Sequence, residues 1–248
     1  MDKILACKIS LDEVNPTDPD SIARSTEVCG LYPYLDWQLA EFPRETHRWC
    51  GRGIGLWQYP SQFGPYLAEI AKRLKKVRSY AEIGTAAGGT FLFTTEFLKL
   101  FAGLEVSYAV DIANIGTVSY IGQEHANPFD GIFEQYLRMT PYAHFFHGNS
   151  SKFADLLKDK HETIDLLLID ADHTYQAVKQ DFEILAPFAS CIVFHDIVND
   201  HCRGVGQFWA EVKQLDVYDS VEFVAQCPTT RGSFLGIGVL FPKSACKR

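Results

Sequence analysis

The chain of 248 residues predicts an α/β protein built on a doubly wound, mostly parallel sheet. Segments with strand character and segments with helix character alternate from about residue 65 onward. The strand segments are nearly all apolar, as in parallel sheets that helices cover on both faces. The last quarter differs, because two β-rich runs separated by a turn sequence predict an antiparallel hairpin at the end of the sheet.

Each element is predicted from the pattern of its own segment. Apolar residues at helical spacing after Pro65 predict a first helix over 65–76. Short apolar runs that end at glycine or polar residues predict strands over 78–83, 105–111, 143–147, 164–170, 191–196, 221–227 and 234–241. The helices between them are predicted over 89–101, 152–158, 174–186 and 204–215.

Two segments have no strong periodic pattern. Residues 1–53, with turns and one or two short helices, are expected to be an extension or cap of a domain that spans residues 54–248. The connection from Ile112 to Tyr142 is long, and long connections in compact domains often form lids or binding loops. We expect it to shape a binding pocket together with four aromatic residues of the N-terminal segment, which are Tyr32, Tyr34, Trp37 and Trp49.

Charge and cysteine usage exclude several classes of protein. A net charge of −8 argues against a nucleic-acid-binding surface, and the densest basic run, from Arg73 to Arg78, is interpreted as a solvated helix end. The seven cysteines contain no Cys-x-x-Cys pair, which predicts reduced, structural thiols in a cytoplasmic protein. A signal peptide and an apolar run of membrane-spanning length are both missing, so no membrane partner is expected.

The stretch from Tyr80 to Thr90 is the most informative part of the sequence. It predicts a strand end, a turn with Gly84, Gly88 and Gly89, and the start of a helix. Dinucleotide-binding turns usually have the spacing Gly-x-Gly-x-x-Gly, whereas the spacing here is Gly-x-x-x-Gly-Gly. A carboxylate at Glu82 would repel phosphate and suit a sulfonium, which favours S-adenosylmethionine (SAM) over a nicotinamide dinucleotide.

Further candidate contacts to SAM follow the next strands. Asp111 ends the second strand, at the spacing expected of an acid that binds a ribose diol, although it could also be a helix cap or a loop acid. Asn149 and Ser150 follow the third strand and are either adenine contacts or the N-cap of the next helix. Thr85 and Thr90, within the glycine turn, complete the expected set with Asp170.

Acidic and histidine residues gather at the ends of two later strands. Asp170, Asp172 and Asp196 are expected to lie together, and carboxylates that close need a cation or a shared proton. A divalent metal such as Mg²⁺ is the simplest cation, with Asp170, Asp196 and His195 as its expected ligands, although His195 could equally be a core histidine. His173 is the expected general base, with Asp170 beside it in the catalytic machinery. Helix capping is the alternative for His173 and Asp172.

Three motifs together resemble the class I SAM-dependent O-methyltransferases. They are Glu82-Ile83-Gly84-Thr85 with Gly88-Gly89-Thr90, then Ile169-Asp170-Ala171-Asp172-His173-Thr174-Tyr175, then Val193-Phe194-His195-Asp196-Ile197. The resemblance covers residues 54–241 and is greatest to the group with the metal-dependent macrolide-sugar O-methyltransferases and the cephalosporin-hydroxylase-like proteins. It implies a Rossmann-like fold, a seven-stranded sheet and a C-terminal antiparallel hairpin.

The resemblance also implies roles for individual residues. The acid matching Asp170 and an acid pair after the next strand bind magnesium in the macrolide-sugar enzymes, and the histidine matching His173 is their proposed base. Here the pair is His195-Asp196, so a histidine stands in place of one acid. The segment from Gly55 to Phe63 resembles one that lies over the cofactor in these relatives, and a packed aromatic entry to the following helix is its alternative.

The leading hypothesis is therefore transfer of a methyl group from SAM to a hydroxyl of a small molecule, such as a sugar or a natural-product diol. The residues after the fifth strand that are expected to reach this acceptor are Asn199, Asp200, His201 and Arg203. Three alternatives stay open: a metal-free methyltransferase that uses His173 alone, a nicotinamide-dependent oxidoreductase, and a non-catalytic SAM-binding protein. The oligomeric state is open as well, with a homo-oligomer as one outcome.

Overall fold

A computed structural model describes residues 2–31, 44–115, 117–120, 123–126, 131–227, 229 and 232–243. Within these residues the chain forms a seven-stranded sheet with the order β5-β2-β1-β6-β7-β9-β8. The strands are β1 (Ser79–Ile83), β2 (Val106–Asp111), β5 (Ala143–His147), β6 (Ile164–Ile169), β7 (Ala189–His195), β8 (Tyr218–Phe223) and β9 (Ile237–Pro242). The first five are parallel, and β9 pairs antiparallel with both β7 and β8. The predicted fold class is confirmed.

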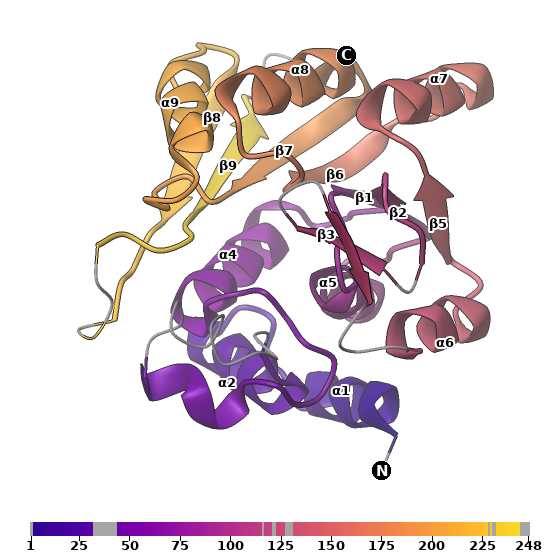
Figure 1. Ribbon diagram of the computed structural model, residues 1–248, viewed down its shortest axis with the longest axis vertical. Coiled ribbons are helices and arrows are strands. Elements are labelled where there is room, and N and C mark those ends of the chain that lie inside the picture. The colour runs from indigo at the N-terminus through magenta and orange to yellow at the C-terminus, as the bar shows by residue number, and fades with distance from the viewer. Residues whose placement is uncertain are drawn as a thin grey trace.

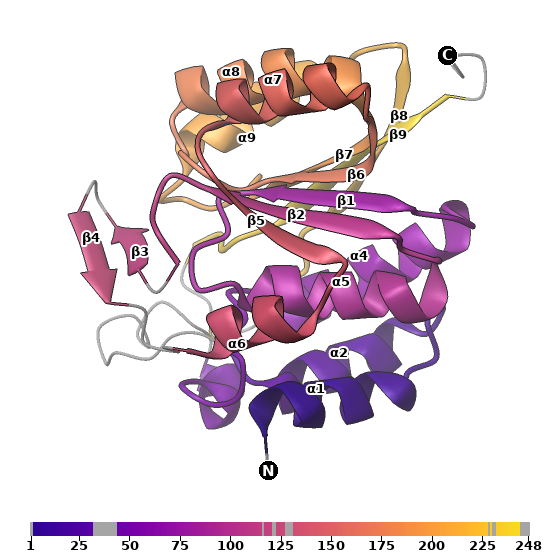
Figure 2. The ribbon, with the colours of Figure 1, turned by 90° about the vertical axis from the view of Figure 1, so that its right-hand side faces the viewer.

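Helices cover both faces of the sheet, as Figures 1 and 2 show. The helices on one face are α7 (Ser150–Lys160), α8 (Tyr175–Leu185) and α9 (Arg203–Val212). Those on the other face are α4 (Pro60–Arg73), α5 (Gly89–Phe101) and α6 (Ile132–Met139). Two short 3-10 helices, η1 (Arg44–Trp49) and η2 (Ala186–Phe188), complete these layers.

The alternation of side chains along each strand divides the core into two clusters. In β1, Ala81 and Ile83 face the α7, α8 and α9 layer, whereas Tyr80 packs with Phe91 on the α4 and α5 side. All five residues of β1 are buried, because helices cover both faces of this central strand. The apolar strands expected from the sequence therefore form the middle layer of the molecule.

The N-terminal helices continue this packing outward. α1 (Lys3–Asp12) and α2 (Pro19–Cys29) form a further layer beyond α4 and α5 (Figure 2). Cys7 of α1 and Cys29 of α2 are buried in the same hydrophobic cluster as Tyr80 and Phe91, with 2.8 Å between their sulfur atoms. The first thirty residues thus share the core of the larger fold, while a domain boundary at residue 53 stays a prediction.

The structure differs from the predicted elements in several places, among them β8, which spans Tyr218–Phe223 where a strand over 221–227 was predicted. α4 begins at Pro60, five residues before the predicted start, and includes Pro65 within the helix. Both prolines are plausible first-turn residues, and the pattern alone does not decide between them. The stretch 112–142 also holds the β3–β4 hairpin (Thr117–Tyr120 and Gln123–Ala126) and α6, none of which was predicted. Among the described residues, no helix combines the length and apolar character needed to cross a membrane.

Candidate active site at the switch point of the sheet

The candidate site lies where the order of the strands reverses. The chain runs outward from β1 through β2 to β5 and then returns to β6 on the other side of β1. In open α/β sheets, ligands bind at such a switch point, outside the carboxyl ends of the strands. Ile83 at the end of β1 pairs with Val110 of β2 and Ile169 of β6. The glycine turn, Asp111 and Asp170 therefore begin at the same edge.

The three glycines of the turn are needed because protein atoms lie against them. A Cβ on Gly84, whose φ is +87°, would lie 2.2 Å from the carbonyl oxygen of Asp170. A Cβ on Gly88 would lie 2.3 Å from the Phe133 ring, and one on Gly89 would lie 2.3 Å from the carbonyl oxygen of Gly55. The glycines thus allow the turn to pack tightly between β6, α6 and the segment that precedes α4.

Asp111 holds the turn in place. Its Oδ2 accepts hydrogen bonds from the backbone N–H groups of Thr85 and Ala86, both at 2.9 Å, and its Oδ1 accepts from Ala113 N–H at 2.8 Å. The left-handed backbone of Ala86, with φ +46°, is part of this arrangement. The loop-acid role that the sequence left open is therefore present, and ribose binding by the remaining lone pairs stays a prediction.

Glu82 is buried beneath the glycine turn. Its side chain lies on the same face of β1 as Tyr80, whose hydroxyl donates a hydrogen bond of 2.6 Å to Oε2 of Glu82. The residue is 1% exposed, and this burial raises the pKa of the Glu82 carboxyl well above its ordinary value. The carboxyl lies inside the α4 and α5 layer, and its predicted role toward a sulfonium stays a prediction.

Asn149 is the N-cap of α7. Its side chain accepts a hydrogen bond of 3.1 Å from Lys152 N–H, which is one of the two roles left open by the sequence. Ser150, the next residue, is buried in the first turn of α7. A contact of either residue with adenine stays a prediction.

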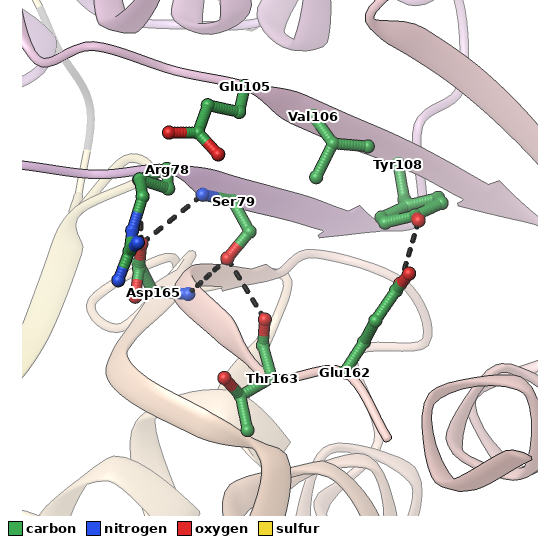
Figure 3. Close-up of a pocket in the computed structure, with 8 residues that line it drawn as sticks. All are labelled: Arg78, Ser79, Glu105, Val106, Tyr108, Glu162, Thr163 and Asp165. Carbon is green, nitrogen blue, oxygen red and sulfur yellow. Dashed lines mark hydrogen bonds between the residues drawn. The ribbon is translucent and has the colours of Figure 1, made fainter. Parts of the chain in front are cut away.

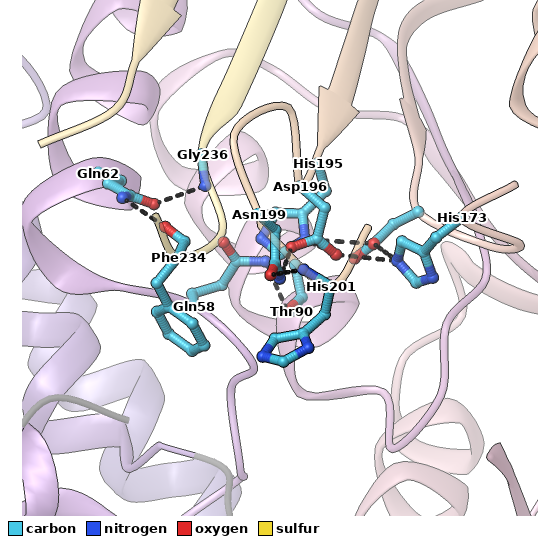
Figure 4. A network of polar contacts seen from close by, with 11 residues as sticks. Gln58, Gln62, Thr90, His173, His195, Asp196, Asn199, His201, Phe234 and Gly236 are labelled. Carbon is cyan, nitrogen blue, oxygen red and sulfur yellow. Dashed lines mark hydrogen bonds and ion pairs between the residues drawn. The ribbon is translucent and has the colours of Figure 1, made fainter. Parts of the chain in front are cut away.

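Two carboxylates and two imidazoles meet at the ends of β6 and β7 (Figure 4). Nε2 of His173 lies 2.8 Å from Oδ2 of Asp196 and 3.5 Å from Oδ1 of Asp170. Nδ1 of His195 lies 3.2 Å from Oδ1 of Asp170 and 3.4 Å from Oδ2 of Asp196. The side chains of His195 and Asp196 are 1% and 4% exposed, whereas that of His173 is 38% exposed. His173 is thus the member of the cluster that a ligand can reach most easily.

The carboxylates change the acid–base behaviour of both histidines. Burial lowers the pKa of His173, but the contacts with Asp170 and Asp196 outweigh it and raise the pKa to about 10. Burial likewise opposes protonation of His195, and the same two acids raise its pKa well above the ordinary value. At neutral pH His173 therefore serves as the positive partner of the acids. It accepts a proton only when another cation takes that role.

The cluster fits a metal ion by an independent observation. Asp170, His195 and Asp196 each offer a ligand atom, and these three atoms lie within 4.8 Å of one another. Neither ring nitrogen of His195 has a hydrogen bond of acceptable geometry, although the ring is buried. Buried polar atoms normally have a hydrogen-bond partner. The unpartnered ring nitrogens of His195 are therefore available to coordinate an ion. A second group with the same spacing consists of His173, Asp196 and Cys202.

The residues expected beside the cluster lie in different places. Asp172 accepts a hydrogen bond from Thr174 N–H at the start of α8, in line with its capping alternative, and is absent from both ligand groups. Asn199 donates from Nδ2 to Oδ1 of Asp196 at 2.7 Å. Asp200 instead accepts from Ser233 N–H and connects this loop to the chain before β9. His201 lies next to Asn199 in Figure 4, with its backbone N–H bonded to the Asn199 side chain.

Arg203 and several residues of the long connection and the N-terminal segment were also expected beside the acceptor. Arg203 begins α9 and donates to the backbone oxygen of Asp200, a local contact at the helix start. Several predicted contributors to the acceptor pocket, namely Tyr32, Tyr34 and Trp37 together with residues 116, 121–122 and 127–130, lie outside the described residues. Their roles stay predictions.

Two buried glutamines next to the site were not singled out from the sequence. Gln58 donates to Oγ1 of Thr90 at 3.3 Å, and its Oε1 has no hydrogen-bond partner. Gln62 donates to Ala225 O and Phe234 O and accepts from Gly236 N–H. Polar residues that recur within an otherwise aromatic segment were the available signal. The backbone of Ile54 and Gly55 also lies against Gly89, so the start of this segment packs on the glycine turn, and its place over a cofactor stays a prediction.

Comparison with known proteins identifies the central part of the chain. Residues 81–197 match the family model described as a methyltransferase domain. The chain has a methyltransferase domain. The match starts in β1 and ends at Ile197, so it contains the glycine turn and all four members of the cluster at β6 and β7.

Relatives of the whole chain are distant. A Sinorhizobium fredii protein described as uncharacterized protein y4gI is 28% identical over 166 residues, or 64% of this chain, and the match spans 17% of that protein's length. A solved Klebsiella pneumoniae structure, described provisionally as an O-methyltransferase, has 14% identity and a TM-score of 0.51, with 93% of this chain and 91% of that chain covered. The cofactor-bound Rv0187 from MTB also has 14% identity and a TM-score of 0.51, covering 90% and 89%. These likenesses show the methyltransferase fold.

Proposed function

We propose that this chain transfers a methyl group from SAM to a hydroxyl group of a small molecule. One observation carries the proposal: within a methyltransferase domain, the Asp170–His173–His195–Asp196 cluster lies at the switch point, on the same edge as the glycine turn. A donor held at the turn and an acceptor held at the cluster would be neighbours. Positioning of two reactants in this way supplies much of the acceleration in bimolecular transfer.

The side of the site near the glycine turn supports the donor. Asp111 fixes the turn through two backbone N–H groups and remains partly exposed, so oxygen lone pairs are left for a ribose diol. Trp57 is half-buried beside Ala87 at the same turn and offers an apolar surface. SAM supplies a methyl group on a positively charged sulfur, and the partly exposed carboxylate of Asp170, which follows β6 next to the turn, is the group proposed to face it.

The other side of the site supports oxygen as the acceptor atom. In the proposed reaction the acceptor oxygen forms a bond to the methyl carbon, the carbon–sulfur bond breaks, and the hydroxyl proton leaves to a base. His173 is the proposed base, because its Nε2 lies at the cluster and its ring is the most exposed member. With Asp170 and Asp196 engaged by a cation, the imidazole is no longer their counter-charge and can accept that proton.

A divalent cation is part of the proposal. Asp170, His195 and Asp196 would hold it, since their ligand atoms lie together and the His195 nitrogens have no other partner. When bound, such an ion supplies a Lewis acid that lowers the pKa of a hydroxyl near it. The net charge of −8 and the acidic site make a small neutral alcohol, such as a sugar or natural-product diol, a better partner than a nucleic acid.

Calorimetry and labelled transfer test the proposal separately. Titration with SAM and with NAD⁺ should give heat of binding for SAM alone, and preferential binding of NAD⁺ would reject a methyltransferase.

Transfer is tested with SAM that carries a label in its methyl group. Offered together with a panel of small alcohols and diols, it should yield a labelled methyl ether. His173→Ala should lower turnover by about 10²-fold or more and leave the Kd for SAM nearly unchanged. Unchanged turnover would remove His173 from the mechanism.

A further inference from the structure

We propose that the metal held by Asp170, His195 and Asp196 is a borderline transition-metal ion, of the class of Mn²⁺, Fe²⁺, Co²⁺ or Zn²⁺, rather than Mg²⁺. The role of this ion in methyl transfer rests on the proposed function. Its binding does not. The resemblance to magnesium-dependent enzymes predicts the opposite ion. The difference depends on one residue, His195, which stands where those enzymes have an acid.

The imidazole of His195 is placed as a ligand. Its Nδ1 lies 3.2 Å and 3.4 Å from oxygen atoms of Asp170 and Asp196, at distances of ion pairs without hydrogen-bond geometry. Its Nε2 has no hydrogen-bond partner either, and the ring is 1% exposed. A histidine with only a packing role would be expected to pair at least one nitrogen when it is so deeply buried. The ring instead directs a nitrogen into the space between two carboxylates.

The chemistry of the donor set then selects the ion. Mg²⁺ prefers oxygen ligands and keeps several of its waters. A buried imidazole would therefore occupy one coordination position of Mg²⁺ without forming a bond that this ion favours. Imidazole nitrogen suits Mn²⁺, Fe²⁺, Co²⁺ and Zn²⁺, and the affinity of mixed nitrogen and oxygen sites rises toward the later ions of this series. Both ligand groups found among the described residues contain a histidine, and the second adds the sulfur of Cys202. Cys202 would therefore make the site softer if it joined the ligands.

The surroundings keep the ligands in position. Asn199 donates to Oδ1 of Asp196 at 2.7 Å, which leaves Oδ2 directed to the histidines. Asp196 itself has the left-handed backbone conformation, with φ +62°, which is uncommon for a residue other than glycine. Residues that hold such a conformation cluster at functional sites. Outer contacts of this kind orient metal ligands and contribute to affinity.

Metal titration of the whole chain tests the proposal without an acceptor. Protein stripped with a chelator is titrated with Co²⁺, Zn²⁺, Mn²⁺ and Mg²⁺ by calorimetry, and Co²⁺ is followed by its visible absorption. Co²⁺ or Zn²⁺ should bind on the order of 10²-fold more tightly than Mg²⁺, with a Co²⁺ spectrum that indicates nitrogen ligation. Equal or tighter binding of Mg²⁺ would overturn the proposal in the unmodified chain, whatever the variants do.

Two variants connect the preference to His195. His195→Asp restores the expected acid and should shift the preference toward Mg²⁺, with loss of the nitrogen-dependent Co²⁺ spectrum. His144→Ala is the matched control, because this exposed histidine on β5 packs at a tilt against Tyr108 and lies outside the cluster, so the metal preference should not change. If both variants kept the preference of the unmodified chain, another residue would be responsible and the assignment to His195 would be wrong. SAM binding measured on the same samples separates failure of this proposal from failure of the proposed function.

Discussion

The amino ends and the carboxyl ends of the parallel strands form two opposite edges of the central sheet, called here the amino edge and the carboxyl edge. Acidic residues lie beside the strand ends at both, but they are paired differently. A pocket of about 250 Å³ lies at the amino edge, where β1, β2 and β6 begin. Figure 3 shows the residues that line it. Oδ2 of Asp165 accepts from the N–H groups of Arg78 and Ser79, and the Ser79 hydroxyl donates to Thr163 O while it accepts from Asp165 N–H. Tyr108 donates to Glu162.

A second pocket at this end, of about 740 Å³, shows the same kind of pairing. It lies at the end of α4, beside β8 and β9, and includes the basic run noted in the sequence. Arg73 pairs with Glu69 and Asp219, and Lys76 pairs with Glu105. The interpretation of this run as a solvated helix end agrees with these exposed ion pairs, which contribute little to stability.

At the carboxyl edge the pairing is incomplete. The histidines of the cluster place nitrogens near carboxylates without hydrogen-bond geometry, and these nitrogen atoms are buried. Unpaired buried polar groups cost free energy, so a protein keeps them where they bind something. Acidic residues at a strand end therefore do not by themselves mark a site, and the buried histidine nitrogens beside the acids make the carboxyl edge the stronger candidate.

The largest contrast is expected between Asp196→Asn and Asp165→Asn. Loss of the buried Asp196 charge leaves His173 and His195 without their shared partner, which should lower the free energy of unfolding by about 3 kcal/mol. Asparagine at position 165 can still accept from the two N–H groups, so a loss of about 1 kcal/mol or less is expected. Urea unfolding, with m unchanged, measures both. Equal losses would contradict the distinction between the two edges.

The strand–helix alternation was readable from the sequence because each element has its own periodicity. β5 and α5 occur at the predicted residues, and the sheet has the expected number of strands. α6 and the β3–β4 hairpin were missed, since elements of four to eight residues offer little periodicity to detect. The burial of Phe133 and Tyr136 against α5 depends on tertiary contacts that the local pattern does not contain.

The cluster at β6 and β7 was also predictable, because parallel strands bring their carboxyl ends together. What could not be predicted was the direction of each side chain. Asp172 is two residues from Asp170 yet bonds to the start of α8, and Glu82 lies within its own strand and points into the helical layer. Their positions depend on backbone geometry around the turns, which residue types alone do not determine.

Glycine substitutions give a contrast of intermediate size. Gly88 at the carboxyl edge and Gly103 at the amino edge have similar φ values of +82° and +73°. A Cβ on Gly103 meets nothing within 4 Å, so Gly103→Ala should cost only the conformational term of about 1–2 kcal/mol. Gly88→Ala adds a clash with Phe133 and should cost a further 1–3 kcal/mol or so. Thermal and urea unfolding measure the difference, and Phe133→Leu should recover part of it. Identical losses would show that the turn is not tightly packed.

Gln62→Leu tests a completely paired residue at the carboxyl edge. Gln62 links α4 to both ends of the β8–β9 connection through three hydrogen bonds to backbone groups. Leucine has a similar volume but leaves those buried groups without a partner, which should cost about 1–3 kcal/mol in urea unfolding. SAM affinity should change little. A variant as stable as the unmodified chain would show that pairing does not determine stability at this edge.

Gln58→Leu should have the smallest effect on folding and the more informative effect on binding. Gln58 is as buried as Gln62, but its Oε1 has no partner and its single bond, to Thr90 at the start of α5, is long at 3.3 Å. Replacing an unpaired buried amide with an apolar group of similar size should change the free energy of unfolding by less than about 1 kcal/mol. If the unpaired oxygen of Gln58 accepts a hydrogen bond from SAM bound at the glycine turn, calorimetry should show SAM binding to the variant weakened by about 3–10-fold. A loss of stability equal to that of Gln62→Leu, with SAM affinity intact, would mean that the unpaired oxygen serves packing rather than binding.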